Sequence, residues 1–351
     1  MAAEILENLA KFPHCILLTR VGQFYEVCFI PLVICRPSHR HCQSYFDQAA
    51  EVSQLLNIKL AGKSWGGQRV PMCGFPILHL DKYLKVLVEK NKRCVAMCEE
   101  FLREPLKGPK GGFDRRVVRI ITPGTLIDEP FLNADENNYL LSFGILGSLE
   151  SMAQNVGLSW IDVSTGEFFT KECTVENLRD ELIRIAPREV VMDKDAANDT
   201  HLSTALEVMV QEGIALSLVT PKTIEQVTPS VPPEGLEPST SALSQNESTA
   251  VKLLTTFLHE HLLESMPKLT QPNREFNEGR MGIDSHTVKG LEIRESMREG
   301  GTTGSLLSVI KRTVTPSGTR LLARWLCMFY HDITFIAFAD DVDIRFPFHT
   351  A

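Results

Sequence analysis

The chain has 351 residues, of which 43% are hydrophobic and 23% charged, and its formal net charge is −8. This composition is ordinary for a globular protein and leaves room for two or three domains. The negative charge argues against wrapping of nucleic acid by the whole surface, so a DNA contact has to be local. Nine cysteines in a chain of this length indicate a reducing compartment rather than a disulfide scaffold. No apolar run is long enough to span a bilayer.

The first part of the chain, residues 1–112, has the pattern of a mixed α/β unit. Its opening segment, 1–11, predicts an amphipathic helix; it has neither the apolar stretch of a signal peptide nor the Arg-rich composition of a transit peptide. The apolar run 15–18 leads into a strand that includes Phe24 and Glu26. Further elements are expected at 46–56 (helix), 58–60 (strand), 80–89 (helix) and 94–98 (buried strand).

The strand at Phe24 combines an aromatic ring with a carboxylate. Side chains alternate along a strand, so Phe24 and Glu26 point to one face and Tyr25 to the other. A ring in this position can wedge between bases from the minor groove, while the carboxyl group hydrogen-bonds an exposed base edge. Packing of Phe24 in the core, with Glu26 solvated at the edge, is the alternative that composition favours.

Positive charge is concentrated in the segment 82–119, which has eleven Lys and Arg against five Asp and Glu. Within it, residues 107–112 form a basic, Gly-containing stretch that suits a loop along a phosphate backbone. A solvated surface loop is the alternative. The predicted DNA contacts besides Phe24 and Glu26 are Arg20, Lys107, Lys110, Arg115 and Arg116.

Three further segments follow the first unit. Residues 113–228 alternate strand and helix patterns, which predicts a second α/β domain. Residues 229–249 are rich in Pro, Ser, Glu and Thr and are expected to form a linker. From 250 to 327 apolar residues recur at helical spacing, which predicts the start of an α-helical domain.

The signals for metal or nucleotide chemistry are weak. No G-x-x-x-x-G-K-[S/T] phosphate loop occurs, so we predict no catalytic residue and no bound cofactor. Three Cys and two His between Cys28 and Cys42 are zinc-ligand types, but their spacing fits no familiar finger, and no metal is expected. Asp162 raises the possibility of a two-metal nuclease, yet no acidic partners follow it at a suitable spacing.

Several short sequence motifs match those of one known family. They are Gly-Gln-Phe-Tyr-Glu at 22–26, Pro-Met-Cys-Gly-Phe-Pro with a later His at 71–79, and a stretch ending in Thr-Pro-Gly-Thr at 117–125. They resemble the motifs G-x-F-Y-E, P-M-x-G-x-P-x-x-H and R-x-V-T-P-G-T of the MutS family of DNA mismatch-repair proteins. The resemblance resumes at 291–293 and between 304 and 326. Within the family, the sequence around these motifs is most similar to the mitochondrial MutS homologue of fungi.

This resemblance implies a fold and a function. Residues 1–112 would be a mismatch-binding domain, 113–228 a connector similar to ribonuclease H, and 250–327 the start of the helical core, or lever, domain. Phe24 would stack on a mispaired base and Glu26 would hydrogen-bond it, so the partner is double-stranded DNA with a mismatch. Family members also form dimers through an ATPase that uses ATP and Mg²⁺, and we expect that domain to be missing from these residues.

The resemblance also implies where the protein works. A role in mitochondrial DNA maintenance is expected, although no transit peptide is evident, and the nucleus is the alternative compartment. The alternative function is that of a truncated, non-functional or regulatory fragment that binds no DNA specifically.

Two segments depart from the family pattern, an atypical insertion at 27–43 and a tail at 328–351. Codons able to encode the start of each include GTATGT, the form of an intron's 5′ splice site, so we interpret both as untranslated gene sequence read as protein. Pro31 and Pro37 cannot continue the strand, which predicts a protruding loop. A genuine family-specific insertion is the alternative.

Overall fold

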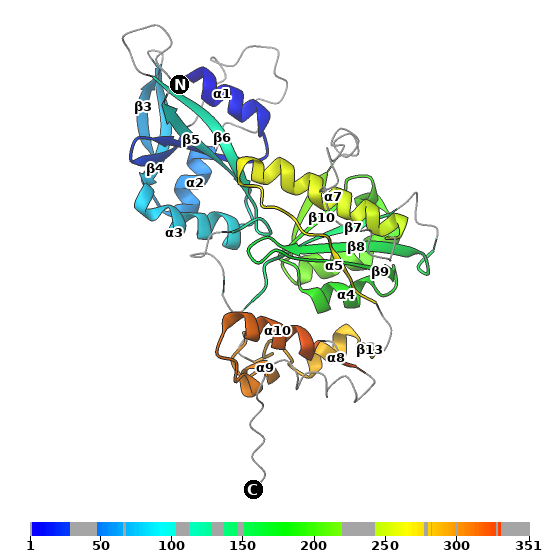
Figure 1. Ribbon diagram of the computed structural model, residues 1–351. Helices are drawn as coiled ribbons and strands as arrows, with labels where there is room; N and C mark the ends of the chain where they lie inside the picture. Colours follow the sequence, from blue (N-terminus) through cyan, green and yellow to red (C-terminus); the bar gives the residue numbers. More distant parts are fainter. Residues whose placement is uncertain are drawn as a thin grey trace.

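The computed structural model describes residues 2–28, 48–65, 68–102, 112–127, 133, 136–145, 151–219, 243–276, 280–281, 283–298, 301–327 and 329–330. They form two six-stranded sheets with helices packed on them, followed by a smaller group of helices (Figure 1). This architecture confirms the predicted class, mixed α/β followed by helices. Most of the predicted insertion (29–43), most of the linker (229–242) and nearly all of the tail lie outside the described residues, as do Lys107 and Lys110.

The first sheet contains the strand that carries Phe24. Its strand order is β3-β4-β2-β1-β5-β6; β1 and β5 are parallel, and every other neighbouring pair is antiparallel. The strands are β1 (Ile16–Val21), β2 (Phe24–Cys28), β3 (Ala61–Trp65), β4 (Gln68–Pro76), β5 (Val95–Leu102) and β6 (Phe113–Ile121).

Helices cover both faces of this sheet. Alternation along β1 sends Ile16 and Leu18 into a core shared with α2, α3 and η3, while Leu17 packs against α1 on the opposite face. The apolar run that predicted a strand therefore serves two cores at once. The helical elements are α1 (Ala2–Lys11), α2 (Gln48–Leu56), α3 (Leu80–Leu84) and the π-helical η3 (Lys85–Lys90).

The first unit extends further along the chain than its predicted end at 112. Strand β6 pairs with β5, from Phe113 opposite Leu102 to Ile121 opposite Val95. Pairing within one sheet ties these residues to the first unit, so the boundary with the second unit lies after β6.

Strand β2 also continues past the predicted start of the insertion. Val27 pairs with Cys73, and Cys28 pairs with Met72. Val27 is 1% exposed, so it belongs to the core of the first unit. Deletion of 27–43 would bring Ser44 to this buried position.

The second sheet has the strand order β11-β10-β7-β8-β9-β12. β7, β8 and β9 form an antiparallel meander, and β10 and β11 continue parallel to β7 on its other side. This mixed sheet agrees with the α/β connector that the sequence predicted. The strands are β7 (Tyr139–Gly144), β8 (Asn155–Asp162), β9 (Glu167–Thr174), β10 (Glu189–Asp193), β11 (Ala215–Val219) and β12 (Asn273–Arg274).

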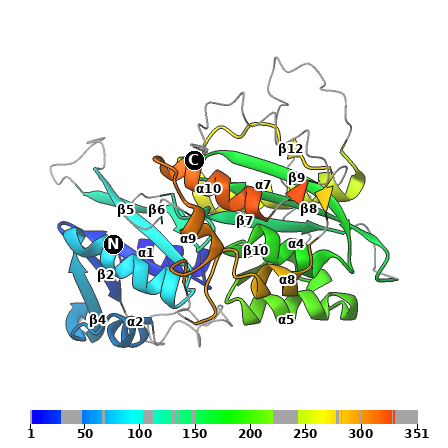
Figure 2. The same ribbon diagram turned by 90° about the horizontal axis from the view of Figure 1, so that it is seen from below.

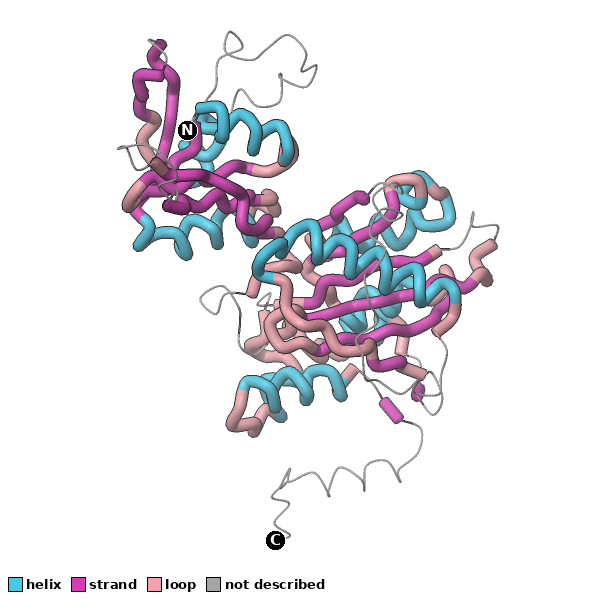
Figure 3. The backbone as a smooth tube through the Cα atoms, turned by 45° about the horizontal axis from the view of Figure 1, so that its top comes forward, coloured by secondary structure: helices cyan, strands magenta, loops and turns pink. Residues whose placement is uncertain are grey.

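Helices also cover both faces of the second sheet. One face packs against α4 (Leu178–Ile185) and α5 (Ser203–Gln211), and the other packs against α7 (Gln245–Leu262) (Figure 3). We expected most of α7 to begin the helical core domain. It instead buries Leu254 and Phe257 against the strands, so α7 belongs to the second unit.

Two glycines allow α7 to approach the strands closely. Gly144 and Gly157 are register partners on β7 and β8. A Cβ on Gly144 would lie 2.1 Å from the carbonyl oxygen of Asn246 in α7, and a Cβ on Gly157 would lie 2.2 Å from the carbonyl carbon of Asn246. Ser142 donates a hydrogen bond to the Ala250 carbonyl at 2.8 Å. The first turn of α7 is therefore seated directly on the sheet.

Replacement of Gly157 by alanine should lower the free energy of unfolding by about 1–3 kcal/mol, because the added methyl group has no space under α7. Urea unfolding followed by circular dichroism measures this change. Gly290→Ala is the matched control, since no atom lies within 4 Å of a Cβ there, and it should leave stability unchanged or slightly raised. Equal stability of Gly157→Ala and the parent chain would contradict the packing.

The last turn of α7 carries a histidine that is buried in its uncharged form. His261 stacks on Phe257 with ring centroids 3.8 Å apart, and its Nδ1 lies 2.8 Å from the Phe257 carbonyl oxygen. Burial lowers the pKa of His261 from 6.5 to about 4. The unfolded chain therefore binds a proton here at a higher pH than the folded chain does.

We expect acid to destabilise the protein through His261 as the pH falls from 6.5 toward 4, because protonation then favours the unfolded chain. Thermal unfolding midpoints across this range give the measurement. His261→Phe keeps the ring stacking and should flatten the dependence, while His286→Phe, at an exposed site on α8, should not. A profile that is unchanged in His261→Phe would refute this role.

The helices that follow the second sheet are attached to it by buried charges. Arg324 on α10 pairs with Glu275 at 2.8 Å, and Glu275 also pairs with Arg184 on α4 at 3.1 Å. The Ser285 N–H at the start of α8 donates to Asp180 of α4 at 2.8 Å, and Figure 2 shows α8 beside α4 and α5. The helices are α8 (Ser285–Gly290), α9 (Leu306–Ile310) and α10 (Pro316–Leu326). A short antiparallel pair joins β13 (Arg280–Met281), before α8, to β14 (Phe329–Tyr330), after α10.

Candidate nucleic-acid interface

The strand that carries Phe24 begins at a tight hairpin turn. Gly22 and Gln23 join β1 to β2, with Val21 opposite Phe24. Gly22 has a φ of +61°, whereas Gln23 has no positive φ. This is the pattern of a type II′ turn, which requires glycine at its first central position. The turn fixes the point at which Phe24 enters the sheet.

The alternation predicted along β2 is confirmed. Tyr25 and Val27 are buried, Glu26 is half-buried, and Phe24 is 48% exposed. The alternative in which Phe24 packs in the core therefore does not hold. A large aromatic ring exposed beside a rigid turn is available to a partner.

The first of two adjacent glutamates on β5 holds the side chains of the hairpin. Glu99 accepts hydrogen bonds from the Arg20 guanidinium at 3.1 Å and the Tyr25 hydroxyl at 2.5 Å. The bond to Glu99 raises the pKa of Arg20; burial, reinforced by the bond to Glu99, raises the pKa of Tyr25. Arg20 keeps 39% of its side chain exposed, so it remains within reach of a phosphate group.

The second glutamate, Glu100, holds the backbone of the same turn. It accepts a hydrogen bond from the Gly22 N–H at 3.0 Å and another from the Arg115 guanidinium. Arg115 also donates to the Arg20 carbonyl at 3.4 Å. Only 9% of the Arg115 side chain is exposed, so the geometry favours a supporting role beneath the hairpin over a phosphate contact.

Glu26 is positioned by an ion pair that the sequence did not suggest. Lys63 Nζ lies 2.6 Å from a carboxylate oxygen of Glu26. Gly74 is the register partner of Glu26, and a Cβ there would lie 2.8 Å from the Tyr25 carbonyl oxygen. The glycine in the middle of the 71–79 block thus allows close pairing beside the carboxylate.

The motif blocks at 22–26 and 71–79 meet at this hairpin. Strand β4 pairs with β2 and places Pro76 opposite Phe24. The Ile77 N–H then donates to the Gln23 carbonyl at 3.0 Å, which ties the end of β4 to the turn. Residues that are about fifty positions apart in the sequence therefore build one edge.

The other predicted contacts lie in different settings. Arg116 is 59% exposed, pairs with Glu264 at 3.1 Å and lies over the Phe101 ring, with its Cζ 4.1 Å from the ring centroid. Lys107 and Lys110 lie outside the described residues. The structure thus gathers Arg20, Phe24, Glu26 and Arg115 at one hairpin.

Sequence reasoning missed the residues that support this hairpin. Glu99 and Glu100 were given no role in holding the hairpin, and Lys63 was not singled out. Adjacent acids on a strand that is otherwise apolar were the available signal, since a buried carboxylate needs a partner.

The Thr-Pro-Gly-Thr turn joins the two sheets through a buried carboxylate. Glu189, at the start of β10, is fully buried and accepts hydrogen bonds from the Gly124 N–H at 2.8 Å and the Ser217 hydroxyl at 2.6 Å. Within the turn, Thr122 and Thr125 bond through their hydroxyls at 2.9 Å. Burial raises the pKa of Glu189, while hydrogen bonds from Ser217, Thr122 and Gly124 act in the opposite direction.

Asp162, the candidate nuclease residue, has a structural use. One of its carboxylate oxygens accepts from the Asn138 N–H at 2.9 Å, and the other accepts from the Ser164 hydroxyl at 2.6 Å. Among the residues that the structure describes, no group of three or more His, Cys, Asp or Glu could hold a metal ion. These bonds support the scaffold interpretation of the second unit.

Comparison of the sequence with models of protein families places this chain in a class of DNA mismatch repair proteins. Models described as MutS domain I, MutS domain II and MutS domain III match residues 38–130, 138–270 and 286–334. The chain belongs to the MutS family and spans these three domains. The domain II model includes α7, in agreement with the packing of that helix, and the domain I model starts after the Phe24 hairpin.

Bacterial relatives match nearly the whole chain. The DNA mismatch repair protein MutS of Nitrobacter hamburgensis is 33% identical over 351 residues, which cover 96% of this chain and 36% of the relative. The MutS protein of Rhodopseudomonas palustris is 33% identical over 96% of this chain and 35% of its own length. That of Roseobacter denitrificans is 32% identical over 92% of this chain and 34% of its own length. The chain thus spans about a third of the length of these relatives. In its described part, no helix is long and apolar enough to cross a membrane.

Replacement of Glu100 by alanine should lower the free energy of unfolding by about 3 kcal/mol, because the Arg115 charge then stays buried without its main partner. Glu264→Ala, which removes an exposed partner of Arg116, is the control and should cost less than about 1 kcal/mol. Urea unfolding of both variants measures the difference. Similar small losses in the two variants would show that Glu100 does not hold the hairpin.

Proposed function

We propose that this chain binds double-stranded DNA that contains a mismatch, with Phe24 inserted at the mispair and Glu26 bonded to the displaced base. The observation that carries this proposal is the exposure of Phe24, 48%, on a turn held by Glu99 and Glu100. A rigid turn presents the ring without a further ordering cost, which favours binding. The wedge acts best at a mispair because weakly paired steps cost less to unstack and kink.

Glu26 supplies the polar half of this recognition. Its carboxylate pairs with Lys63 in the free protein. On DNA, Glu26 exchanges this partner for the edge of the displaced base, and Lys63 becomes available to a phosphate oxygen. Arg20, which is 39% exposed beside the turn, and the exposed Arg116 add charge along the backbone.

The wider role rests on the resemblance and on the family. The resemblance of the sequence motifs to the fungal mitochondrial MutS homologue is the basis on which we propose a function in mitochondrial DNA maintenance, with the nucleus as the alternative compartment. In a complete family member, the mismatch signal passes to a dimeric ATPase. No phosphate loop occurs within residues 1–351, so sensing is the function assigned to this part. A regulatory fragment without specific DNA binding is the alternative.

Phe24→Ala should abolish the preference for a mismatched duplex while weak, salt-sensitive binding remains. Stacking of a base on an aromatic ring contributes about 1–3 kcal/mol, so roughly a tenfold or larger loss of mismatch affinity is expected. Fluorescence anisotropy with matched and mismatched duplexes at two salt concentrations gives the measurement.

Phe276→Ala is the matched control for this experiment. Phe276 is 50% exposed, like Phe24, but it follows β12 of the second sheet and is not part of the Phe24 hairpin. It should bind as the parent chain does. Retention of the mismatch preference by Phe24→Ala would refute the wedge. No preference in the parent chain at either salt concentration would favour the regulatory fragment.

A further inference from the structure

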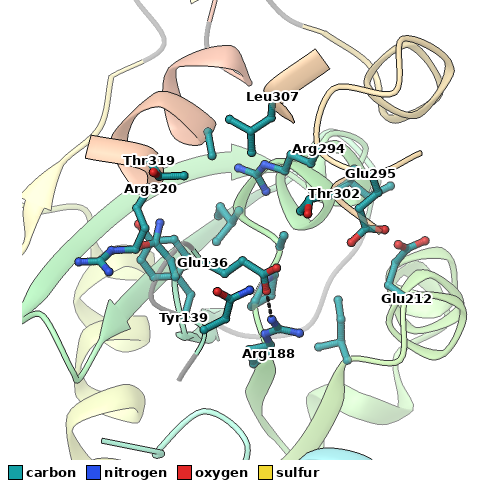
Figure 4. Close-up of a pocket in the computed structure, with 18 of the residues that line it drawn as sticks. Glu136, Tyr139, Arg188, Glu212, Arg294, Glu295, Thr302, Leu307, Thr319 and Arg320 are labelled. Atoms are coloured by element: carbon teal, nitrogen blue, oxygen red, sulfur yellow. Dashed lines mark hydrogen bonds and ion pairs between the residues drawn. The ribbon is translucent and has the colours of Figure 1, made fainter. Parts of the chain in front are cut away.

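A cavity of about 490 Å³ lies between the second sheet and the helices that follow it (Figure 4). One side is formed by the end of α4, the turn 186–188 and the start of β7. The other side is formed by α9, α10 and the segment that carries Arg294. Small-molecule sites have volumes of about 300–1,000 Å³, so the cavity has the size of a ligand site.

Two polar atoms in the cavity wall have no protein partner. Nε of Arg294 is a buried donor, and Oδ1 of Asn137 is a buried acceptor; neither has a hydrogen bond in the part of the chain that the structure describes. Buried polar atoms without a partner are rare in proteins. Figure 4 shows the Arg294 side chain directed into the cavity from the helical side. Both atoms are suited to a polar ligand.

The lining is cationic, although the chain as a whole has a net charge of −8. Five Lys and Arg line the cavity against three Glu. Two of these glutamates are paired, Glu136 with Arg188 and Glu212 with Lys289. In Figure 4, Glu212 and Glu295 lie together at one side, away from the Arg294 guanidinium. The region around Arg294 is therefore the one that suits an anion.

The remaining lining residues determine the kind of anion. Thr302 and Thr303 contribute hydroxyl groups, and Leu182 and Leu307 contribute apolar surface. A guanidinium fork together with hydroxyl donors matches the several oxygens of a phosphate group. The apolar wall matches an organic group attached to it.

We propose that this cavity binds a small organic phosphate ester, with its phosphate on Arg294 and its organic part against the apolar wall. The site is separate from the Phe24 hairpin. Because its walls come from both the second sheet unit and the helices α9 and α10, the bound ester holds these two parts of the chain together.

Thermal unfolding of the whole chain with added ligands tests the proposal. The probes are adenosine monophosphate and glucose 6-phosphate, with adenosine as the phosphate-free control, all at one ionic strength. At least one ester should raise the unfolding midpoint, since a ligand stabilises the state that it binds. Isothermal titration calorimetry should then show about tenfold or weaker affinity in Arg294→Ala, because a charge-assisted bond is lost.

Two more variants complete the test. Arg298→Ala removes an exposed arginine of the same segment and should bind as the parent does. Asn137→Asp preserves shape but adds a negative charge to the cavity wall. Because this charge repels an anionic ester, the variant should bind about tenfold or more weakly, even if Arg294→Ala fails to fold. The proposal is overturned if neither ester shifts the midpoint, if adenosine stabilises equally well, or if Asn137→Asp binds as tightly as the parent.

Discussion

The buried carboxylate of Glu189 is the constraint on which the arrangement of the two sheets depends. It connects Gly124, in the turn that leaves the first sheet, to Ser217 in the second. A carboxylate removed from water requires such donors, because burial of an unpaired charge is costly. Space is restricted as well, since a Cβ on Gly124 would lie 2.9 Å from the Glu189 Cβ. The Thr-Pro-Gly-Thr block therefore has a physical reason for its composition, and the hairpin that presents Phe24 is linked to the connector through a short, rigid path of β5, β6 and this turn.

The hairpin itself shows how a polar network can hold an apolar group in solvent. An exposed phenylalanine gains nothing from burial, so its position has to be fixed by its neighbours. Glu99 and Glu100 provide this support by bonding to a side chain and a backbone N–H of the turn. The pair Glu26–Lys63 likewise gives the carboxylate of Glu26 a partner, at 2.6 Å. The recognition that we propose therefore requires an exchange of partners at Glu26 rather than a rearrangement of the backbone.

Local sequence patterns predicted many of the helices and strands, but few of the long-range contacts that hold them in place. The alternation along β2 gave the correct faces for Phe24, Tyr25 and Glu26, because strand periodicity depends only on neighbouring residues. The pairing of Arg20 with Glu99 joins positions 79 residues apart, and no local pattern encodes such a distance. The same reason explains why α7 was assigned to the wrong unit, since its sequence predicts a helix without saying which surface it covers. The cavity at Arg294 is lined by segments that range from Lys92 to α10, so no local pattern could predict it either.

The seat of α7 on Gly144 and Gly157 decides how the protein can be divided into recombinant pieces. A connector fragment that ended at 228, where the composition changes, would lack α7 and uncover the apolar face around Leu140 and Ile161. Exposed faces of this kind favour aggregation. A fragment that continues through β12 keeps this face covered, and it also retains the pair of Arg274 with Glu247 at 2.8 Å, which anchors the start of α7. The smallest soluble piece of the connector is therefore set by a helix encoded beyond the linker.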